Sequence, residues 1–123
     1  MDVTPLIDSD VYVIHSVSDA GIVIDGQHYD RTIGLVPSRI TPLPIVSISD
    51  ITPEALQEFY PALEDLDIVI LGTGKNHTFV PLEVQSLFTE KGVSIEFMTT
   101  FAACRTYNTL LAEGRRLGAV LIL

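Results

Sequence analysis

Residues 68–74 read IVILGTG, four apolar residues followed by a glycine-rich turn. A continuous apolar run that ends in glycine is typical of a strand buried on both faces, as in a parallel sheet. Further along, the sequence alternates between predicted helices (residues 81–91 and 101–113) and predicted strands (residues 93–97 and 119–123). This order of strand, helix, strand, helix, strand predicts a small parallel sheet with right-handed crossovers.

A third helix is predicted before the first of these strands. Residues 52–54 read TPE, which supplies a capping hydroxyl, a proline at the first helical position and an acid that the helix dipole favours. The apolar residues that follow at helical spacing share one face: Leu56, Phe59 and Leu63. The pattern predicts a short amphipathic helix.

The beginning of the chain has the texture of antiparallel β-structure. Residues 11–17 and 21–24 are β-rich runs separated by a polar turn. Asp25 and Gly26 then form a strong tight-turn signal ahead of residues 27–29. Together these features predict an antiparallel meander.

Prolines at positions 37, 42 and 44 interrupt the next stretch. Because proline donates no hydrogen bond to a sheet ladder, only residues 45–48 are predicted to be extended, as an edge or crossing strand. The texture of the sequence changes near Asp50. We therefore interpret residues 1–123 as a single domain, with a β-rich layer at residues 1–49 and a βαβαβ portion at residues 50–123.

The charge balance argues against several classes of partner. Sixteen acidic residues against seven basic ones give a net charge of −9, which opposes binding to nucleic acid or to an anionic membrane. The longest apolar run, residues 119–123, is far too short to span a bilayer. The single cysteine, Cys104, cannot form an intramolecular disulfide, and residues 1–10 carry no basic side chain of the kind that targeting sequences use. We expect a cytoplasmic protein that neither binds nucleic acid nor inserts into a membrane.

The loops after Leu71 and Phe97 are the first candidates for a binding site, because open parallel sheets bind ligands beyond the carboxyl ends of their strands. Residues 72–75 resemble a phosphate loop, but a Walker motif would need glycine in place of Val69, and a dinucleotide motif would need glycine in place of His77. We therefore predict no nucleotide cofactor. The candidate ligand or partner surface is instead expected where the two loops meet, and it comprises Gly72, Thr73, Gly74, Thr99, Thr100, Cys104, Arg105 and Asn108.

Cys104 is the one candidate nucleophile. Its position early in the last predicted helix, next to Arg105, would favour the thiolate. However, Cys104 borders the buried stripe of that helix, and its nearest plausible base is His77 in a separate loop. No pair of histidines or cysteines shows metal-ligand spacing. We predict that Cys104 packs as a small apolar side chain and that the chain holds no metal.

Four segments together carry a family resemblance: residues 71–74 (LGTG), 100–108 (TFAACRTYN), 113–115 (EGR) and 118–119 (GA). In this order and spacing they resemble the small uncharacterised-domain family that includes mitochondrial complex I assembly factor 3 and the adipogenesis-associated relative, with this chain a bacterial-type member. The resemblance implies a three-layer α/β domain with a mixed central sheet and an added N-terminal β layer. It also implies association with other proteins, and it supplies no established catalytic residue.

These observations predict a non-enzymatic interaction or assembly factor with a protein partner. Two alternatives draw on the same residues. In the first, the backbone amides of residues 72–74 and the N-terminus of the helix at Phe101 bind a small ligand or anion. In the second, Cys104 is the nucleophile of a thiol-dependent enzyme.

Overall fold

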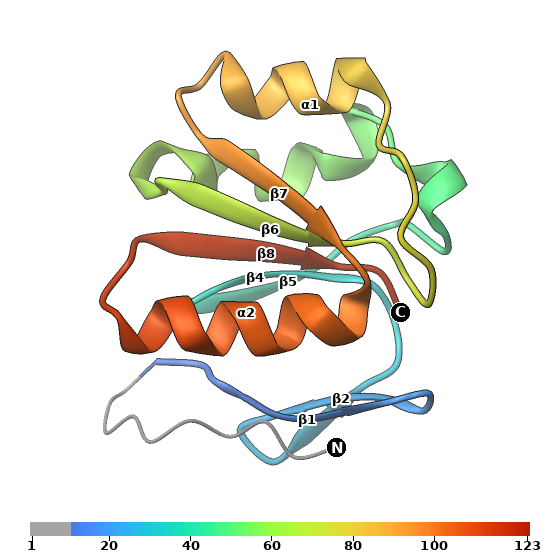
Figure 1. Cartoon of the computed structure of the whole chain (residues 1–123), viewed down its shortest axis with the longest axis vertical. Helices are drawn as coiled ribbons and strands as arrows, with labels where there is room; N and C mark the ends of the chain where they lie inside the picture. The colour runs from blue at the N-terminus through green and yellow to red at the C-terminus, as the bar shows by residue number, and fades with distance from the viewer. Residues whose placement is uncertain (1–10) are drawn as a thin grey trace.

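The second half of the chain forms alternating strands and helices in the computed structural model, which describes residues 11–123 (Figure 1). In chain order the elements are β6 (Ile68–Gly72), α1 (Leu82–Thr89), β7 (Ser94–Met98), α2 (Thr100–Ala112) and β8 (Leu117–Leu121). Strand β6 pairs in parallel with both β7 and β8. The predicted βαβαβ order and the parallel pairing are therefore confirmed.

Two strands that the sequence did not predict complete this sheet. Strand β4 (Ile33–Val36) pairs antiparallel with β8, and β5 (Arg39–Pro42) pairs antiparallel with β4. The result is a mixed five-stranded sheet in the order β5-β4-β8-β6-β7, as the family resemblance implied. The prolines flank these strands: Pro37 lies in the turn between them, and Pro42 ends the edge strand, where a missing N–H is tolerated.

The prediction of a strand at residues 45–48 is wrong. The carboxylate of Asp50 accepts hydrogen bonds from the backbone N–H groups of Val46 at 3.2 Å and Ser47 at 3.1 Å, and Ile48–Asp50 forms a short 3-10 helix, η1. A side chain that satisfies backbone donors locally takes the segment out of any sheet ladder. Residue 49 also does not separate two layers, because β4 and β5 belong to the central sheet.

The predicted antiparallel meander is confirmed as a second, three-stranded sheet. Its strands, β1 (Ile14–Ser18), β2 (Gly21–Ile24) and β3 (Gln27–Tyr29), pair antiparallel in that order. Asp25 and Gly26 make the turn between β2 and β3 with φ angles of 52° and 79°, the left-handed conformation that Asp-Gly hairpin turns require. Figure 1 shows this small sheet next to α2, on the side of α2 away from α1.

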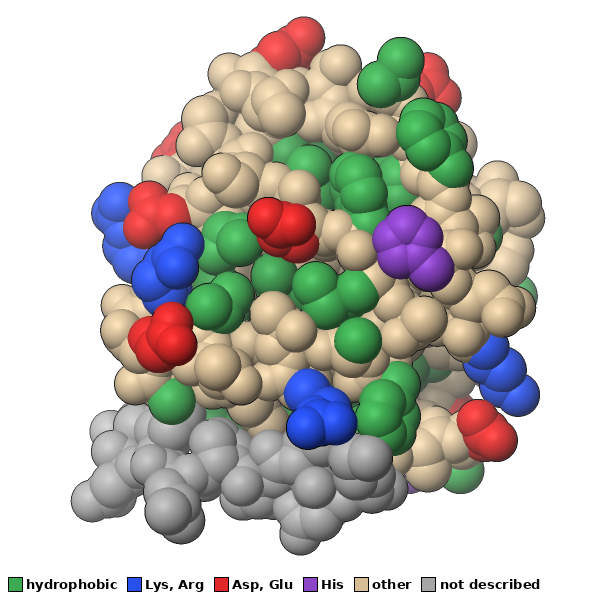
Figure 2. Space-filling view, in the orientation of Figure 1, with side chains coloured by type: hydrophobic (Ala, Val, Ile, Leu, Met, Phe, Trp, Pro, Cys, Tyr) green, Lys and Arg blue, Asp and Glu red, His purple; other side chains and the backbone are tan. Residues whose placement is uncertain are grey.

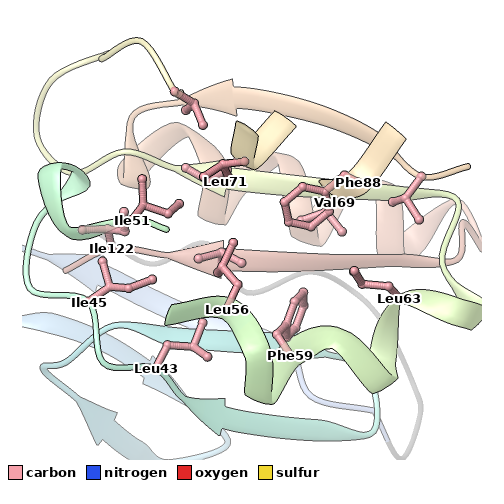
Figure 3. Packing of buried hydrophobic residues seen from close by; sticks show 14 of the residues in the cluster. Leu43, Ile45, Ile51, Leu56, Phe59, Leu63, Val69, Leu71, Phe88 and Ile122 are labelled. Carbon is pink, nitrogen blue, oxygen red and sulfur yellow. The ribbon is translucent and has the colours of Figure 1, made fainter. Parts of the chain in front are cut away.

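The amphipathic helix predicted before β6 is η2 (Glu54–Asp65), which has 3-10 rather than α geometry. The Thr52 hydroxyl accepts a hydrogen bond from the N–H of Ala55 at 3.1 Å, although the N-cap residue is Pro53, one position later than expected. The predicted apolar face is confirmed as buried, and in Figure 3 its side chains point toward the sheet: Leu56, Phe59 and Leu63. A Cβ at Gly34 of β4 would collide with the Phe59 ring, so glycine at this position lets η2 approach the sheet closely.

Buried side chains cover both faces of the central sheet. Helices η2 and α1 cover one face, which β6 supplies with Val69 and Leu71 (Figure 3). Helix α2 and the small sheet cover the other face, which β6 supplies with Ile68 and Ile70. The continuous apolar run of β6 is thus explained, because successive side chains point to opposite faces and both faces are covered.

Strands β5 and β7 form the edges of the central sheet. On β7 the side chains of Ile95 and Phe97 pack against the cluster beneath α1, whereas Glu96 is exposed. A charged side chain on an edge strand opposes pairing with a strand of another chain. The exposed carboxylate of Glu96 therefore opposes the addition of a further strand next to β7.

Asn108 fastens the small sheet to α2. Its side-chain oxygen accepts a hydrogen bond from the N–H of Ile14 at 3.0 Å, and its side-chain nitrogen donates to the carbonyl of Ile14 at 2.7 Å. The ladder between β1 and β2 is irregular between Ile14 and Ser16, next to the peptide groups that Asn108 binds. Because Asn108 is only 3% exposed, water has little access to replace these bonds.

Replacing Asn108 with alanine is expected to lower the free energy of unfolding by about 2–4 kcal/mol, because two buried peptide groups of Ile14 lose their partner. Urea-induced unfolding measures the loss. Thr109→Ala is the matched control, since the Thr109 hydroxyl is exposed and bonds back to the carbonyl of Arg105 in its own helix. That control should change stability by less than about 0.5 kcal/mol, and equal losses in the two variants would contradict the role given to Asn108.

Candidate functional site

Thr100, the first residue of α2, joins the chain segments that leave the carboxyl ends of β6 and β8. Its hydroxyl accepts a hydrogen bond from the N–H of Gly74 at 2.9 Å and donates to the carbonyl of Ile122 at 2.6 Å. Its own N–H donates to the carbonyl of Gly74 at 2.9 Å. We call this set of contacts, together with the neighbouring residues Thr73 and Thr99, the Thr100 junction.

Close packing explains the glycine-rich loop. A Cβ at Gly72 would lie 2.8 Å from both the Cα and the Oγ1 of Thr100, so only glycine lets α2 approach β6 this closely. Thr73 then closes the loop, because its hydroxyl donates to the carbonyl of Asn76 at 2.6 Å and its N–H donates to the carbonyl of Met98 at 2.8 Å. The residues that resemble a phosphate loop therefore hold strand ends together.

A pocket of about 500 Å³ opens beside the Thr100 junction. Gly74 and residues 99–101 line one side of it, the turn between β1 and β2 at residues 18–21 lines another, and residues 122–123 complete it. That the small sheet lines this pocket could not be predicted, because nothing in the local sequence pattern indicates that the turn between β1 and β2 lies near the start of α2. A pocket of this volume is in the range of small-ligand sites.

The charges of this pocket do not favour an anion. Asp19 and Asp30 both line it, against the single basic residue Lys75. Lys75 and Asp19 approach each other at 3.8 Å with side chains 79% and 90% exposed, so this ion pair lies in solvent and contributes little to stability. Two acids against one base leave the lining net negative at neutral pH.

The backbone donors that were expected to bind an anion are already used. The N–H groups of Thr73 and Gly74 are bound within the Thr100 junction. The N–H of Ala102 donates to the Thr99 hydroxyl at 3.3 Å, and that of Ala103 donates to the Thr99 carbonyl at 2.8 Å. Thr99 therefore caps α2, and an anion at this loop would have to displace internal hydrogen bonds.

The structure divides the eight predicted surface residues into two groups. Those with accessible atoms are Gly74, Thr99 and Arg105. The other five are buried, and among them Thr100 also lines the pocket: Gly72, Thr73, Thr100, Cys104 and Asn108. Their family resemblance is accounted for by packing at the junction and in the core.

Cys104 is wholly buried between α2 and the small sheet, which confirms the prediction of a packed cysteine. Burial raises the pKa of its thiol to about 12, so the thiol is protonated at neutral pH. His77, the base considered for it, is exposed in the loop after β6. The folded protein therefore does not supply the thiolate that a thiol-dependent enzyme would need. The hydroxyl of Tyr107 is also buried, without a hydrogen-bond partner among residues 11–123, and burial raises its pKa.

No three or more His, Cys, Asp and Glu side chains of residues 11–123 are grouped so that they could hold a metal ion. The same part of the structure has no helix both long and apolar enough to cross a bilayer. The exposure of two hydrophobic residues at the start of α1, Phe79 and Leu82, was not predicted, and neither was that of Val46, which is 81% exposed. A signal was present in the sequence, because Leu82 falls outside the helical stripe that Val84 and Phe88 form at about 100° per residue.

Comparison with known proteins now gives the family. The family described as "Protein of unknown function (DUF498/DUF598)" matches residues 14–122, from the first strand to the end of the central sheet. This chain belongs to that family. This is the family that the four sequence segments indicated, since several of the curated relatives of the chain are named as the assembly factor.

One curated relative is the Bos taurus protein named NADH dehydrogenase (ubiquinone) 1 alpha subcomplex assembly factor 3. It is 32% identical to this chain over 109 residues, which are 89% of this chain and 59% of the relative. The chain thus spans about three fifths of the length of that relative.

Two solved structures share the fold of this family member along most of their length. A crystal structure of a Bordetella parapertussis protein has a TM-score of 0.85 and 29% identity, and the match covers 93% of this chain and 97% of the other. A Bartonella henselae protein titled an outer membrane protein has a TM-score of 0.82 and 28% identity, covering 91% and 94%. These two structures therefore share the overall fold of this chain.

Thr100→Val removes the hydroxyl of the junction and keeps the volume of the side chain. The carbonyl of Ile122 and the N–H of Gly74 lose this partner, so the free energy of unfolding in urea is expected to fall by about 2–3 kcal/mol. Thr100→Ser keeps the hydroxyl and should retain most of that stability. A valine variant as stable as the serine variant would show that the hydroxyl does not hold the junction.

Iodoacetamide should label Cys104 in the folded protein at least about a hundredfold more slowly than in the urea-unfolded chain at about pH 8, because the folded thiol is buried and protonated. Mass spectrometry over time gives both rates. A short cysteine peptide labelled in both solutions corrects for the effect of urea on the reagent. Rapid labelling of the folded protein would reopen the case for a reactive cysteine.

Proposed function

We propose that this chain acts by binding another protein, as an assembly-type factor, and that it does not catalyse a reaction. Membership of a family with a relative named as an assembly factor supports this function. The Thr100 junction supports it too, because its polar groups bond to one another instead of converging on a reacting atom. The cytoplasm is the proposed compartment, in keeping with the lone and unpaired Cys104.

The observation that carries the proposal is an exposed pair of hydrophobic side chains, Phe79 and Leu82, which we call the α1 patch. They are 73% and 69% exposed, one in the loop before α1 and the other at its first residue. Folding gains little from side chains left in water, whereas full burial of each against a partner contributes about 1.5–3 kcal/mol. Aromatic side chains such as that of Phe79 are enriched in protein interfaces, and Leu82 adds apolar area beside it.

The surroundings of α1 offer further apolar surface. Figure 2 shows hydrophobic side chains in a band across the face between α1 and α2, where Figure 1 places β7. Ile95 and Phe97 of β7 are only partly buried in the cluster beneath α1. A partner that covered the α1 patch could extend onto this band, which would increase the apolar area removed from water.

The double variant Phe79→Ser and Leu82→Ser tests the α1 patch. Tagged wild-type protein, expressed at native level in its own cells, is expected to retain a defined protein partner, quantified by mass spectrometry. The double variant should recover at least about tenfold less of that partner, because it lacks the two apolar side chains whose burial stabilises the complex. Thermal unfolding of the purified variant checks that its fold is intact.

Phe101→Ser is the matched control. Phe101 is a partly exposed aromatic residue at the start of α2, and α2 and α1 cover opposite faces of the central sheet. This variant should capture the partner as the wild type does. Recovery of the wild-type protein alone at several salt concentrations would count against an interaction factor. Undiminished capture by the double variant would remove the α1 patch from the interface.

A further inference from the structure

A second pocket lies at the end of the central sheet where β6 and β8 begin, opposite the Thr100 junction. Its volume is about 540 Å³, and it is enclosed by the end of η2, the turn between β4 and β5, and the segment that leads from α2 into β8. Of the segments that carry the family resemblance, only residues 113–115 reach it, through Arg115. It is formed by segments that are far apart in the chain and meet only in the folded protein.

Three arginines line this pocket, Arg39, Arg115 and Arg116, out of seven basic residues in a chain of net charge −9. Figure 2 shows basic and acidic side chains together at this side of the molecule, where α2 ends and β8 begins in Figure 1. Such a concentration of guanidinium groups in an acidic protein is unexpected for a surface that only needs to be solvated. The question is whether internal acids already neutralise them.

Arg116 is neutralised. Its guanidinium donates to the two carboxylate oxygens of Asp67 at 3.2 Å and 2.8 Å, a bidentate pair that holds both side chains in place. Arg39 and Arg115 differ, because neither forms an ion pair with any acid within residues 11–123. Their donors face water at the rim of a pocket.

One acid, Asp65, also lines the pocket. With Arg116 balanced by Asp67, the remaining charges are those of Arg39, Arg115 and Asp65, which leave the lining with a net charge of one positive unit. A single negative charge balances this lining, whereas a phosphate dianion would leave the occupied pocket with a net negative charge. The planar fork of arginine also matches the two oxygens of a carboxylate.

The other walls of the pocket are apolar. Pro37 comes from the turn between β4 and β5, Pro61 from η2, and Leu66 from the segment before β6. Prolines hold their backbone rigidly, so the walls lose little conformational entropy when a ligand is bound. Mostly apolar walls with a few convergent charged groups are the usual composition of small-ligand sites, and the volume lies within their range.

We propose that this pocket binds a small organic monocarboxylate, with the carboxylate between Arg39 and Arg115 and an apolar body against Pro37, Pro61 and Leu66. The site is separate from the α1 patch, so it adds a ligand to the proposed interaction function and does not depend on it. Because the guanidinium groups are exposed, salt weakens their attraction for the carboxylate.

Titration of the full chain with hexanoate, followed by amide chemical shifts, tests the site. Hexanoate is expected to bind with a dissociation constant of order millimolar and to shift the amides of residues 38–39, 66 and 115–117. Hexanamide has the same body without the charge, and inorganic phosphate has charge without the body. Both should bind at least about tenfold more weakly, since each lacks one half of the recognition.

Charge-removing variants show whether the arginines are responsible. Arg39→Gln with Arg115→Gln should weaken hexanoate binding at least about tenfold, whereas Arg31→Gln with Arg105→Gln, two arginines outside the pocket, should leave it unchanged. Asp65→Asn should tighten it, because a like charge is removed. The Phe79→Ser and Leu82→Ser variant should bind hexanoate normally, so failure of the interaction function and failure of this site are distinguishable.

Three results would overturn the proposal. The first is the absence of hexanoate shifts at these residues. The second is equal binding of hexanamide or tighter binding of phosphate, which would show that the site does not recognise a monocarboxylate. The third is the same loss of affinity in the two double arginine variants, which would show that hexanoate responds to overall charge.

Discussion

The hydroxyl of Thr100 is the contact on which the carboxyl end of the central sheet depends. It receives a hydrogen bond from the chain that leaves β6 and gives one to the chain that leaves β8, while its own helix begins at the same residue. Three segments far apart in sequence thus share one polar group in a place where Thr100 is 7% exposed. The close approach at Gly72 belongs to the same arrangement, because a larger residue would push α2 away from β6. These requirements account for the glycine-rich loop without any role in binding a nucleotide.

A single polar side chain also joins α2 to the small sheet. Asn108 gives both ends of its amide to the backbone of Ile14, so a single side chain ties the small sheet to α2. Cys104 and Tyr107 of the same helix lie in the hydrophobic cluster on this face of the sheet: both are fully buried, and burial raises the pKa of each. The helix that looks richest in functional side chains is therefore mainly a structural one. Its accessible part is limited to its first residues and its outward face.

Much of the second half of the fold could be predicted from sequence because its signals are local. The apolar run of β6, the helical spacing of Leu56, Phe59 and Leu63, and the cap at Thr99 each depend on residues close together in the chain. Strands β4 and β5 were missed because Ile33–Val36 becomes a central strand only by pairing with β8, at the far end of the sequence. The extended segment expected at residues 45–48 failed because Asp50 satisfies its donors locally, a competition that β-propensity does not describe.

The candidate site was predictable in a similar, partial way. The meeting of residues 72–74 with the start of α2 follows from parallel strand order, but the exposure of individual side chains does not. Helical spacing places Cys104 at the buried stripe of its helix and Leu82 outside that of α1, but it does not show that Asn108 is buried or that Phe79, in the loop before α1, faces water. Nor could it bring Arg39 and Arg115 to one pocket, because these residues meet only after β4 has paired with β8.

The exposed Glu96 on the edge strand β7 has a consequence for the kind of complex this protein can form. An unprotected parallel edge would let any extended peptide extend the sheet through main-chain hydrogen bonds, which read almost no sequence. A carboxylate at the middle of that edge makes such additions costly, because a docked strand would bury the charge. Selectivity for a partner then has to come from side-chain surfaces, where shape and chemistry can be tuned residue by residue. Glu96 thus opposes non-specific association through this edge in a protein that has exposed apolar side chains elsewhere.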